Sequence, residues 1–169
     1  MSQPAQAHHA STSTANGEAD TGEFLTFVLG EEEYGVDILR VQEIRSYDAV
    51  TRLPDAPDYI KGVINLRGII VPVVDMRLKF RLAKAEYNAL TVMIVLSVGG
   101  RVVGMVVDSV SDVVRLSGEQ VRTVPEIGAT IDRQFLTGIG TLDERMLILL
   151  DIERLMGHEI MGLVAAEAA

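Results

Sequence analysis

The sequence predicts a mainly β fold, a sandwich or a barrel, built from two copies of one unit. Two observations lead to this. Short runs rich in Val, Ile, Leu and aromatic residues follow one another with Gly, Asp or Pro between them, among them FLTFVL, IIVPVVD, TVMIVLSV and RMLILLDI. The second observation is that the chain repeats itself, with corresponding residues 69 to 76 positions apart.

The first residues are not expected to join this fold. Residues 1 to about 22 are mostly Ala, Ser, Thr, Gln, His and Gly without apolar periodicity, and we expect a disordered tail there. Order should begin near Phe24. Further along, Gly99-Gly100 lies between two apolar runs and predicts a hairpin turn. Pro72 cannot donate to a strand ladder, so its strand is expected to lie at an edge or to be bulged there.

The repeat is an ordered series of matches, which chance does not readily produce. In chain order they are Tyr34-Gly35-Val36 with Val103-Gly104-Met105, Val41 with Val110, Glu43 with Asp112, Leu53-Pro54-Asp55 with Val124-Pro125-Glu126, Gly62 with Gly138, and Asp75 with Asp151. The shift grows from 69 to 76 positions, which places a few additional residues in loops of the second copy.

The repeat divides the chain into units of about 24–80 and 91–156, joined by the polar stretch RLAKAEYNAL. Each unit is small for an independent core, so the two are expected to pack on each other, for example by exchanging strands. Asp75 and Asp151 are placed to cap two short helices, MRLKF and IERLM. The end of the chain, 158–169, is expected to form a C-terminal helix or tail.

Composition excludes several classes of function. The formal net charge is −9 and no Lys/Arg cluster is present, which argues against a nucleic-acid binder. No apolar run reaches the ~18 residues of a membrane helix, and no export signal opens the chain, so a cytoplasmic protein without direct membrane insertion is expected.

The sequence also offers no catalytic or metal-binding constellation. His8 and His9 lie in the tail and His158 near the end, so no histidine falls within the repeated units. No phosphate-binding glycine motif is present, and we expect no cofactor and no metal. The acidic run Glu31-Glu32-Glu33 is read as a solvated hairpin turn, with a contact to a cation or a basic partner as the alternative. These observations predict a non-catalytic protein.

Four segments, EEEYGVDILRVQEI, IKGVINLRGIIVPVVDMR, RVVGMVVDSVSDV and FLTGIG…RMLILLDIERL, resemble the CheW family of chemotaxis coupling proteins. The resemblance covers residues 24 to about 157, and INLRG-x-x-x-P-V-x-D is its most specific piece. It implies two SH3-like five-stranded β barrels around a hydrophobic groove, within a CheW-like domain over 23–157. It also implies a non-catalytic scaffold that couples chemoreceptors to a histidine kinase and is recruited to membrane-associated receptor arrays.

The resemblance implies two partners. One is the CheA-type regulatory domain of the kinase, which would contact the surface of the second barrel at residues that cannot be assigned individually. The other is the cytoplasmic tip of a chemoreceptor (a methyl-accepting chemotaxis protein). The receptor-facing residues that the resemblance implies are Val41, Glu43, Gly62, Arg67, Val92 and Val113.

Each of these residues has a structural alternative. Val41, Val92 and Val113 lie in apolar runs and could belong to the core. Gly62 has Gly138 as its counterpart, which favours a requirement of the fold such as close backbone approach. Glu43 has Asp112 opposite it in the second copy, which suggests a structural polar position.

Arg67 is the most informative of the six. It lies in the tight turn Asn65-Leu66-Arg67-Gly68, where we expect its side chain to project outward. Its match in the second copy is Asp143, of opposite charge. That difference favours a charged anchor for a partner over a solvated turn residue.

Overall fold

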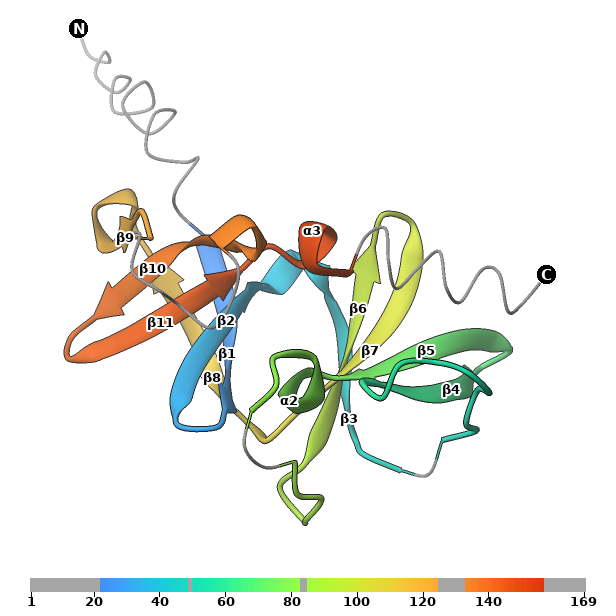
Figure 1. Ribbon diagram of the computed structural model, residues 1–169. Coiled ribbons are helices and arrows are strands. Elements are labelled where there is room, and N and C mark those ends of the chain that lie inside the picture. The colour runs from blue at the N-terminus through green and yellow to red at the C-terminus, as the bar shows by residue number, and fades with distance from the viewer. Residues whose placement is uncertain (1–21, 49, 83–84, 125–132, 157–169) are drawn as a thin grey trace, which may run out of the picture.

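A computed structural model describes residues 22–48, 50–82, 85–124 and 133–156 (Figure 1). It contains two antiparallel-rich sheets and a few short helices. The strands are β1 (Gly22–Leu29), β2 (Glu32–Asp37), β3 (Val41–Ser46), β4 (Ile60–Leu66), β5 (Ile69–Asp75), β6 (Val92–Val98), β7 (Arg101–Val107), β8 (Ser109–Leu116), β9 (Val121–Arg122), β10 (Leu136–Leu142) and β11 (Arg145–Leu150). The helices are η1 (Ile38–Arg40), α2 (Met76–Lys79), η2 (Gly118–Gln120), η3 (Arg133–Phe135) and α3 (Ile152–Met156).

The two repeats exchange their first hairpins. The six-stranded sheet has the order β8-β1-β2-β11-β10-β9, and the five-stranded sheet has the order β3-β6-β7-β5-β4. Hairpin β1-β2 of the first repeat therefore lies among the strands of the second, and hairpin β6-β7 of the second lies among those of the first (Figure 1). The mainly β fold class is confirmed, and the exchange of strands is the way in which the two units pack on each other.

The register of the two sheets reproduces the shifts found in the sequence. Phe27 pairs with Val110 in one sheet, and Leu96 pairs with Val41 in the other, so each residue maps onto its counterpart by 69 positions. Each sheet also contains one parallel pairing at the equivalent place, β5 with β7 and β2 with β11. The duplication is therefore present in the backbone as well as in the sequence.

Both sheets close into barrels at equivalent seams. In the five-stranded sheet the chain after β3 returns to β4, where Thr51 and Val63 exchange backbone hydrogen bonds of 2.9 and 2.8 Å. In the other sheet the chain after β8 returns as β9, which pairs with β10. We call the two units the five-stranded barrel and the six-stranded barrel.

A single core joins the barrels. It contains buried side chains of β1 and β2 from the six-stranded barrel, of β6 and β7 from the five-stranded barrel, and of both α2 and α3. Each barrel also has a small interior cluster of its own, one around Val71, Val73 and Met93 and the other around Leu116, Leu147 and Leu149. Neither repeat could bury the shared core alone, which agrees with the small size of each unit.

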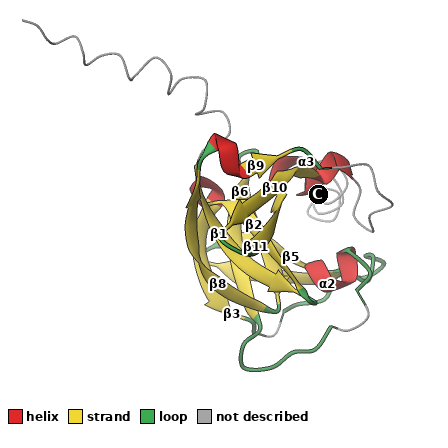
Figure 2. Cartoon of the chain, turned by 90° about the vertical axis from the view of Figure 1, so that its left-hand side faces the viewer, coloured by secondary structure: helices red, strands yellow, loops and turns green. Residues whose placement is uncertain are grey.

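The short helices begin as the sequence predicts. Asp75 caps α2, with its side chain accepting a hydrogen bond from the backbone N–H of Arg77. Asp151 accepts one from the N–H of Arg154 in α3. Both helices lie on one side of the strands (Figure 2). Within the described ranges no helix is long and apolar enough to cross a bilayer.

Some expectations need correction or lie outside the described residues. Pro72 was expected in an edge strand or at a bulge. The strand is not an edge, since β5 lies between β7 and β4, but the register of β4 with β5 does shift next to Pro72, between the pairs Ile60–Val74 and Gly62–Val73. The proline is tolerated because the ladder with β7 begins only at Val73. Gly99 and Gly100 take positive φ values of 54° and 82° and form the predicted turn. The helix or tail expected over 158–169 lies outside the described ranges. The tail was expected over 1–22; residues 1–21 lie outside the described ranges, and Gly22 is the first residue of β1.

Candidate functional site

Strand β3 presents a polar row on one face. Alternate residues of a strand point to the same side, and here Glu43 and Arg45 are half-buried while Ile44 between them is exposed. Val41 is also half-buried, but the register of β3 with β6 shifts between it and Glu43. Because β3 is an edge strand of the five-stranded sheet, this row lies beside the seam where the barrel closes.

Arg67 approaches the same row from the other edge of the sheet. It occupies the turn between β4 and β5 with φ at 53°, and Gly68 N donates a 2.8 Å hydrogen bond to Asn65 Oδ1 within that turn. Its side chain is 66% exposed, and its guanidinium donates to Glu43 Oε1 at 3.2 Å. The outward projection predicted for Arg67 is therefore observed, together with a partner that the sequence did not indicate.

Glu43 is shared between two arginines. Its Oε1 accepts from Arg67, and its Oε2 accepts from Arg45 at 3.2 Å. The hydrogen bond from Arg45 is the largest influence on the Glu43 carboxyl and lowers its pKa below the ordinary value. Desolvation comes next and opposes it, and the hydrogen bond and charge of Arg67 add smaller lowering contributions. Two guanidinium groups around one carboxylate leave this cluster with a surplus positive charge.

Gly62 lies beneath the seam. It is buried with φ at 143°, and a Cβ on it would lie 2.0 Å from the carbonyl oxygen of Thr51. Its counterpart Gly138 is also crowded, though less so, with a Cβ position 2.8 Å from the carbonyl oxygen of Arg122. This geometry gives Gly62 a structural role, since it lets the chain after β3 approach β4.

The three valines fall in different surroundings. Val41 and Val92 are half-buried and pack against the core shared by the barrels. Val113 lies on β8 of the six-stranded barrel and is 51% exposed. The structure thus brings Glu43 and Arg67 into contact, whereas Val113 belongs to the other sheet.

Exposed apolar side chains accompany Arg67. Ile69 and Ile70, the first residues of β5, directly follow the turn and are both more than half exposed. An exposed arginine beside exposed isoleucines combines a charged and an apolar contact in one place. Such a combination is typical of protein-binding surfaces.

The six-stranded barrel carries a related cluster with the opposite balance of charge. Arg145 donates through Nε and Nη2 to Glu33, at 3.1 and 2.7 Å, and also donates to Asp112, with Nη2 3.0 Å from Oδ1. One guanidinium here serves two carboxylates. The hydrogen bond from Arg145, followed by that from Thr26, lowers the pKa of Asp112. Glu33 is therefore ion-paired on β2 and is not part of a solvated turn.

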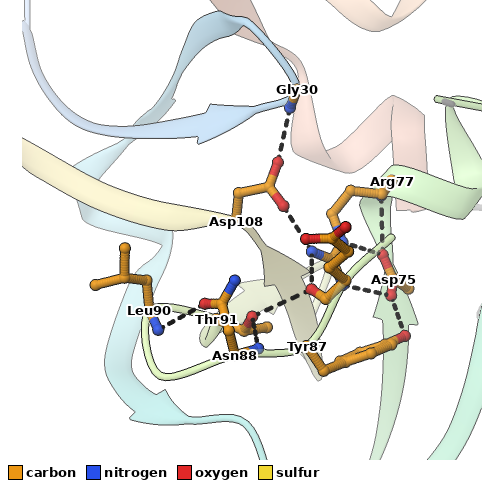
Figure 3. A network of polar contacts seen from close by, with 9 residues as sticks. Gly30, Asp75, Arg77, Tyr87, Asn88, Leu90, Thr91 and Asp108 are labelled. Atoms are coloured by element: carbon orange, nitrogen blue, oxygen red, sulfur yellow. Dashed lines mark hydrogen bonds and ion pairs between the residues drawn. The ribbon is translucent and has the colours of Figure 1, made fainter. Parts of the chain in front are cut away.

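A buried network fixes the connections between the barrels (Figure 3). The fully buried guanidinium of Arg77 donates to Asp75 through Nε at 2.7 Å and to Asp108 through Nη1 at 2.6 Å. Asp108 in turn accepts from Gly30 N, at the β1-β2 turn of the other barrel, at 2.7 Å. Tyr87 also donates to Asp75. The sequence indicated Asp75 as a helix cap but not this second role.

A cavity of about 250 Å³ lies at the seam. Arg45, Ser46 and Thr51 line it from one side, and Val63, Ile64 and Asn65 from the other. Among the described residues, no group of three or more His, Cys, Asp or Glu side chains could hold a metal ion. The site is thus a polar and apolar surface around Glu43, Arg45 and Arg67, which we call the seam cluster.

Comparison with known proteins gives consistent matches over nearly the whole described chain. The family model of the CheW-like domain matches residues 23–159. The chemotaxis protein CheW of Klebsiella aerogenes is 57% identical over 155 residues, covering 92% of this chain and 93% of that protein. The chemotaxis protein CheW of Rhizobium meliloti is 36% identical over 137 residues, covering 81% and 88%.

A solved structure gives the same result. The crystal structure of the scaffolding protein TtCheW from Thermoanaerobacter tengcongensis superimposes with a TM-score of 0.75. It shares 32% sequence identity and covers 82% of this chain and 89% of its own.

Proposed function

Because the chain belongs to the CheW-like family, we propose that it is an adaptor that joins the cytoplasmic tip of a chemoreceptor to the regulatory domain of a chemotaxis histidine kinase. A scaffold role in chemotaxis, without catalysis, follows from the family. The coupling of receptor to kinase is the step that we add.

The observation that carries the proposal is the exposed anchor Arg67. Its guanidinium is oriented by Glu43 and is flanked by the exposed side chains of Ile69 and Ile70. A receptor tip is a helical hairpin, and a helix presents an apolar stripe edged by charged residues. Arg67 would bind a receptor carboxylate or a helix carbonyl, while apolar side chains receive the stripe.

The other receptor-facing residues take supporting roles in this proposal. Val41 and Val92 form the rim of the shared core beside β3, and Val113 offers an exposed apolar contact on β8. Gly62 contributes by shaping the seam under Thr51 rather than by touching the receptor.

For the kinase, the proposal uses the surface of the six-stranded barrel. Met146, at the start of β11, is 64% exposed, and it lies next to the ion-paired Arg145. Its counterpart in the five-stranded barrel is Ile70, since the two residues lie three positions after the turn residues Asp143 and Arg67, at a shift of 76. Two equivalent surfaces that differ in charge allow two different partners to be bound at once.

The mechanism that we propose is thermodynamic coupling. The adaptor, placed in the cytoplasm at receptor arrays, holds receptor and kinase in a fixed geometry, so that each partner's two states bias the other's. Coupling free energies of this kind are typically ~1–3 kcal/mol. Many linked copies would raise the effective concentration and sharpen the response.

A ternary binding experiment tests the proposal. A soluble receptor-tip fragment and the kinase regulatory domain are titrated separately and then together onto the protein, and complexes are measured by analytical ultracentrifugation. We expect two binary complexes and one ternary complex. Competition between the two ligands for a single site would contradict the adaptor function.

A further inference from the structure

Arg45 has an unusual place in the seam cluster. Its Nε is buried and has no hydrogen-bond partner, and it is the one such buried side-chain nitrogen or oxygen among the residues that the structure describes. A buried N–H of a cation is seldom left unpaired, because its lost hydration is not replaced. Arg45 reaches Glu43 only through Nη1, at 3.2 Å. Charge-assisted N–H···O bonds are usually about 2.7–2.9 Å long, so this contact is longer than usual.

Other arginines of the same protein show what Arg45 lacks. Arg77 donates to Asp75 through both Nε and Nη2, at 2.7 and 3.1 Å. Arg145 holds Glu33 through the same two nitrogens, at 3.1 and 2.7 Å. Arg45 stands two positions from Glu43 on the same face of β3, within reach of such a paired contact. It does not make one in this structure, where the other oxygen of Glu43 accepts from Arg67 instead, at 3.2 Å.

We propose that, when a partner binds, the carboxylate of Glu43 gives up its hydrogen bond with Arg67 and forms a two-nitrogen contact with Arg45. In the free protein Glu43 orients Arg67 through one long bond. When a carboxylate of the partner binds the guanidinium of Arg67, the Glu43 side chain moves toward Arg45. It then accepts hydrogen bonds from both Nε and a terminal nitrogen of Arg45. The unpaired Nε–H of Arg45 then has an acceptor, and the carboxylate of Glu43 remains paired with a positive charge. The cavity of about 250 Å³ beside Arg45 leaves its side chain room to adjust.

Arg45 is in this account a positioning residue that strengthens binding without touching the partner. The inference rests on the proposed receptor contact of Arg67, but its first step can be tested without any partner. Truncation of Arg67 should produce the same transfer in the free protein, since Glu43 then has only Arg45 to pair with.

The first experiment is NMR of the arginine Nε–Hε groups in the wild type and in Arg67→Ala. We expect the Arg45 Hε signal to move downfield, as on hydrogen-bond formation. The Arg145 signal, already bonded to Glu33 in the other barrel, serves as the internal control and should not move. An unchanged Arg45 signal would contradict the transfer of Glu43 to Arg45, independently of any result on receptor binding.

The second experiment is a double-mutant cycle on binding of a receptor-tip fragment. Arg45→Lys keeps the charge but cannot form the two-nitrogen contact. We expect it to weaken binding about 5-fold in the wild type and to have no effect in the Arg67→Ala background. An equal effect in both backgrounds would mean that Arg45 acts independently of Arg67, and no effect in either would remove Arg45 from binding.

The two proposals fail in different ways. If Arg67→Ala leaves receptor binding unchanged while the Arg45 signal moves, the receptor contact at Arg67 is wrong and the transfer stands as a property of the free protein. If Arg67→Ala abolishes binding while Arg45→Lys binds like the wild type, the receptor contact stands and the transfer is wrong.

Discussion

At the scale of single residues, the seam cluster shows what local sequence can and cannot reveal. The turn geometry and the outward direction of Arg67 follow from Asn65-Leu66-Arg67-Gly68, and both are observed. Its contact with Glu43, 24 positions earlier, depends on how the barrel closes, so no local pattern could indicate it. Arg45 was missed, although its i, i+2 spacing from Glu43 on a strand is a signal that could have pointed to it.

Reversal of the anchor charge tests the receptor contact. Arg67→Glu should weaken binding of a receptor-tip fragment by about 2 kcal/mol or more, roughly 30-fold. The substitution replaces the cation that would bind a partner carboxylate with a second carboxylate beside Glu43. The thermal unfolding midpoint should change little, since the side chain is exposed. Calorimetric titration and a melting curve measure the two quantities. Wild-type affinity in the variant would remove Arg67 from the receptor site.

Two glycines of the same hairpin separate packing from backbone conformation. Gly62→Ala should destabilise the fold by about 3 kcal/mol or more, because its Cβ would overlap Thr51 O in addition to requiring a positive φ. Gly68→Ala, with φ at 91° and no atom within 4 Å of its Cβ position, has only the conformational penalty of about 1 kcal/mol. Urea unfolding of both variants gives the comparison. Equal losses would contradict the close approach at the seam.

At the scale of elements, the duplication was visible in the sequence but the partners of each strand were not. The shift of 69 positions is reproduced by the strand register, yet the same shift would fit two separate barrels or two barrels with exchanged hairpins. The choice depends on long-range pairing between apolar runs that resemble one another locally. Pro72 shows the same limit, because a proline is compatible with an inner strand when the neighbouring ladder begins after it.

The cap of α2 also predicts a pH dependence of stability. Burial alone would raise the pKa of Asp75, but hydrogen bonds from Arg77 and Tyr87 outweigh it and hold the pKa below its ordinary value. A carboxyl with a depressed folded pKa stabilises the fold above its unfolded pKa of about 4, and that contribution is lost as the pH falls through the folded value.

We therefore expect the free energy of unfolding to drop as the pH is lowered from about 4. Asp75→Asn should be less stable at pH 7 and should lack this part of the acid dependence. Asp112→Asn is the comparison from the exposed cluster, where the pKa is also lowered but the carboxyl is open to solvent. Chemical unfolding at several pH values measures these differences. A parallel acid profile in Asp75→Asn and the wild type would contradict the assignment.

At the scale of the whole molecule, one shared core holds two barrels whose equivalent surfaces have diverged. The five-stranded barrel gathers two arginines around Glu43, and the six-stranded barrel gathers Glu33 and Asp112 around Arg145. A duplicated fold thus displays two faces of opposite charge in a geometry fixed by the buried Arg77 network. That arrangement suits a scaffold for two different partners.

Mutations on one barrel should weaken the binding of one partner and spare the other. Met146→Glu should weaken binding of the kinase regulatory domain by roughly 10-fold while leaving receptor-tip binding within a factor of two, because it buries a charge in an apolar contact of one face only. Ile70→Glu, at the equivalent position of the other barrel, is the matched control and should show the reverse pattern. Parallel titrations of both ligands decide the point, and equal losses for both would show that the faces do not act separately.

The central claim, that the protein couples receptor state to kinase activity, is tested most directly by reconstitution. Receptor, kinase and ATP are combined with and without this protein, and the rate of kinase phosphorylation is measured in the presence and absence of a receptor ligand. The account predicts that the rate changes with receptor ligand only when the protein is present, and that Arg67→Glu abolishes this dependence. A rate that is the same with and without the protein would contradict it.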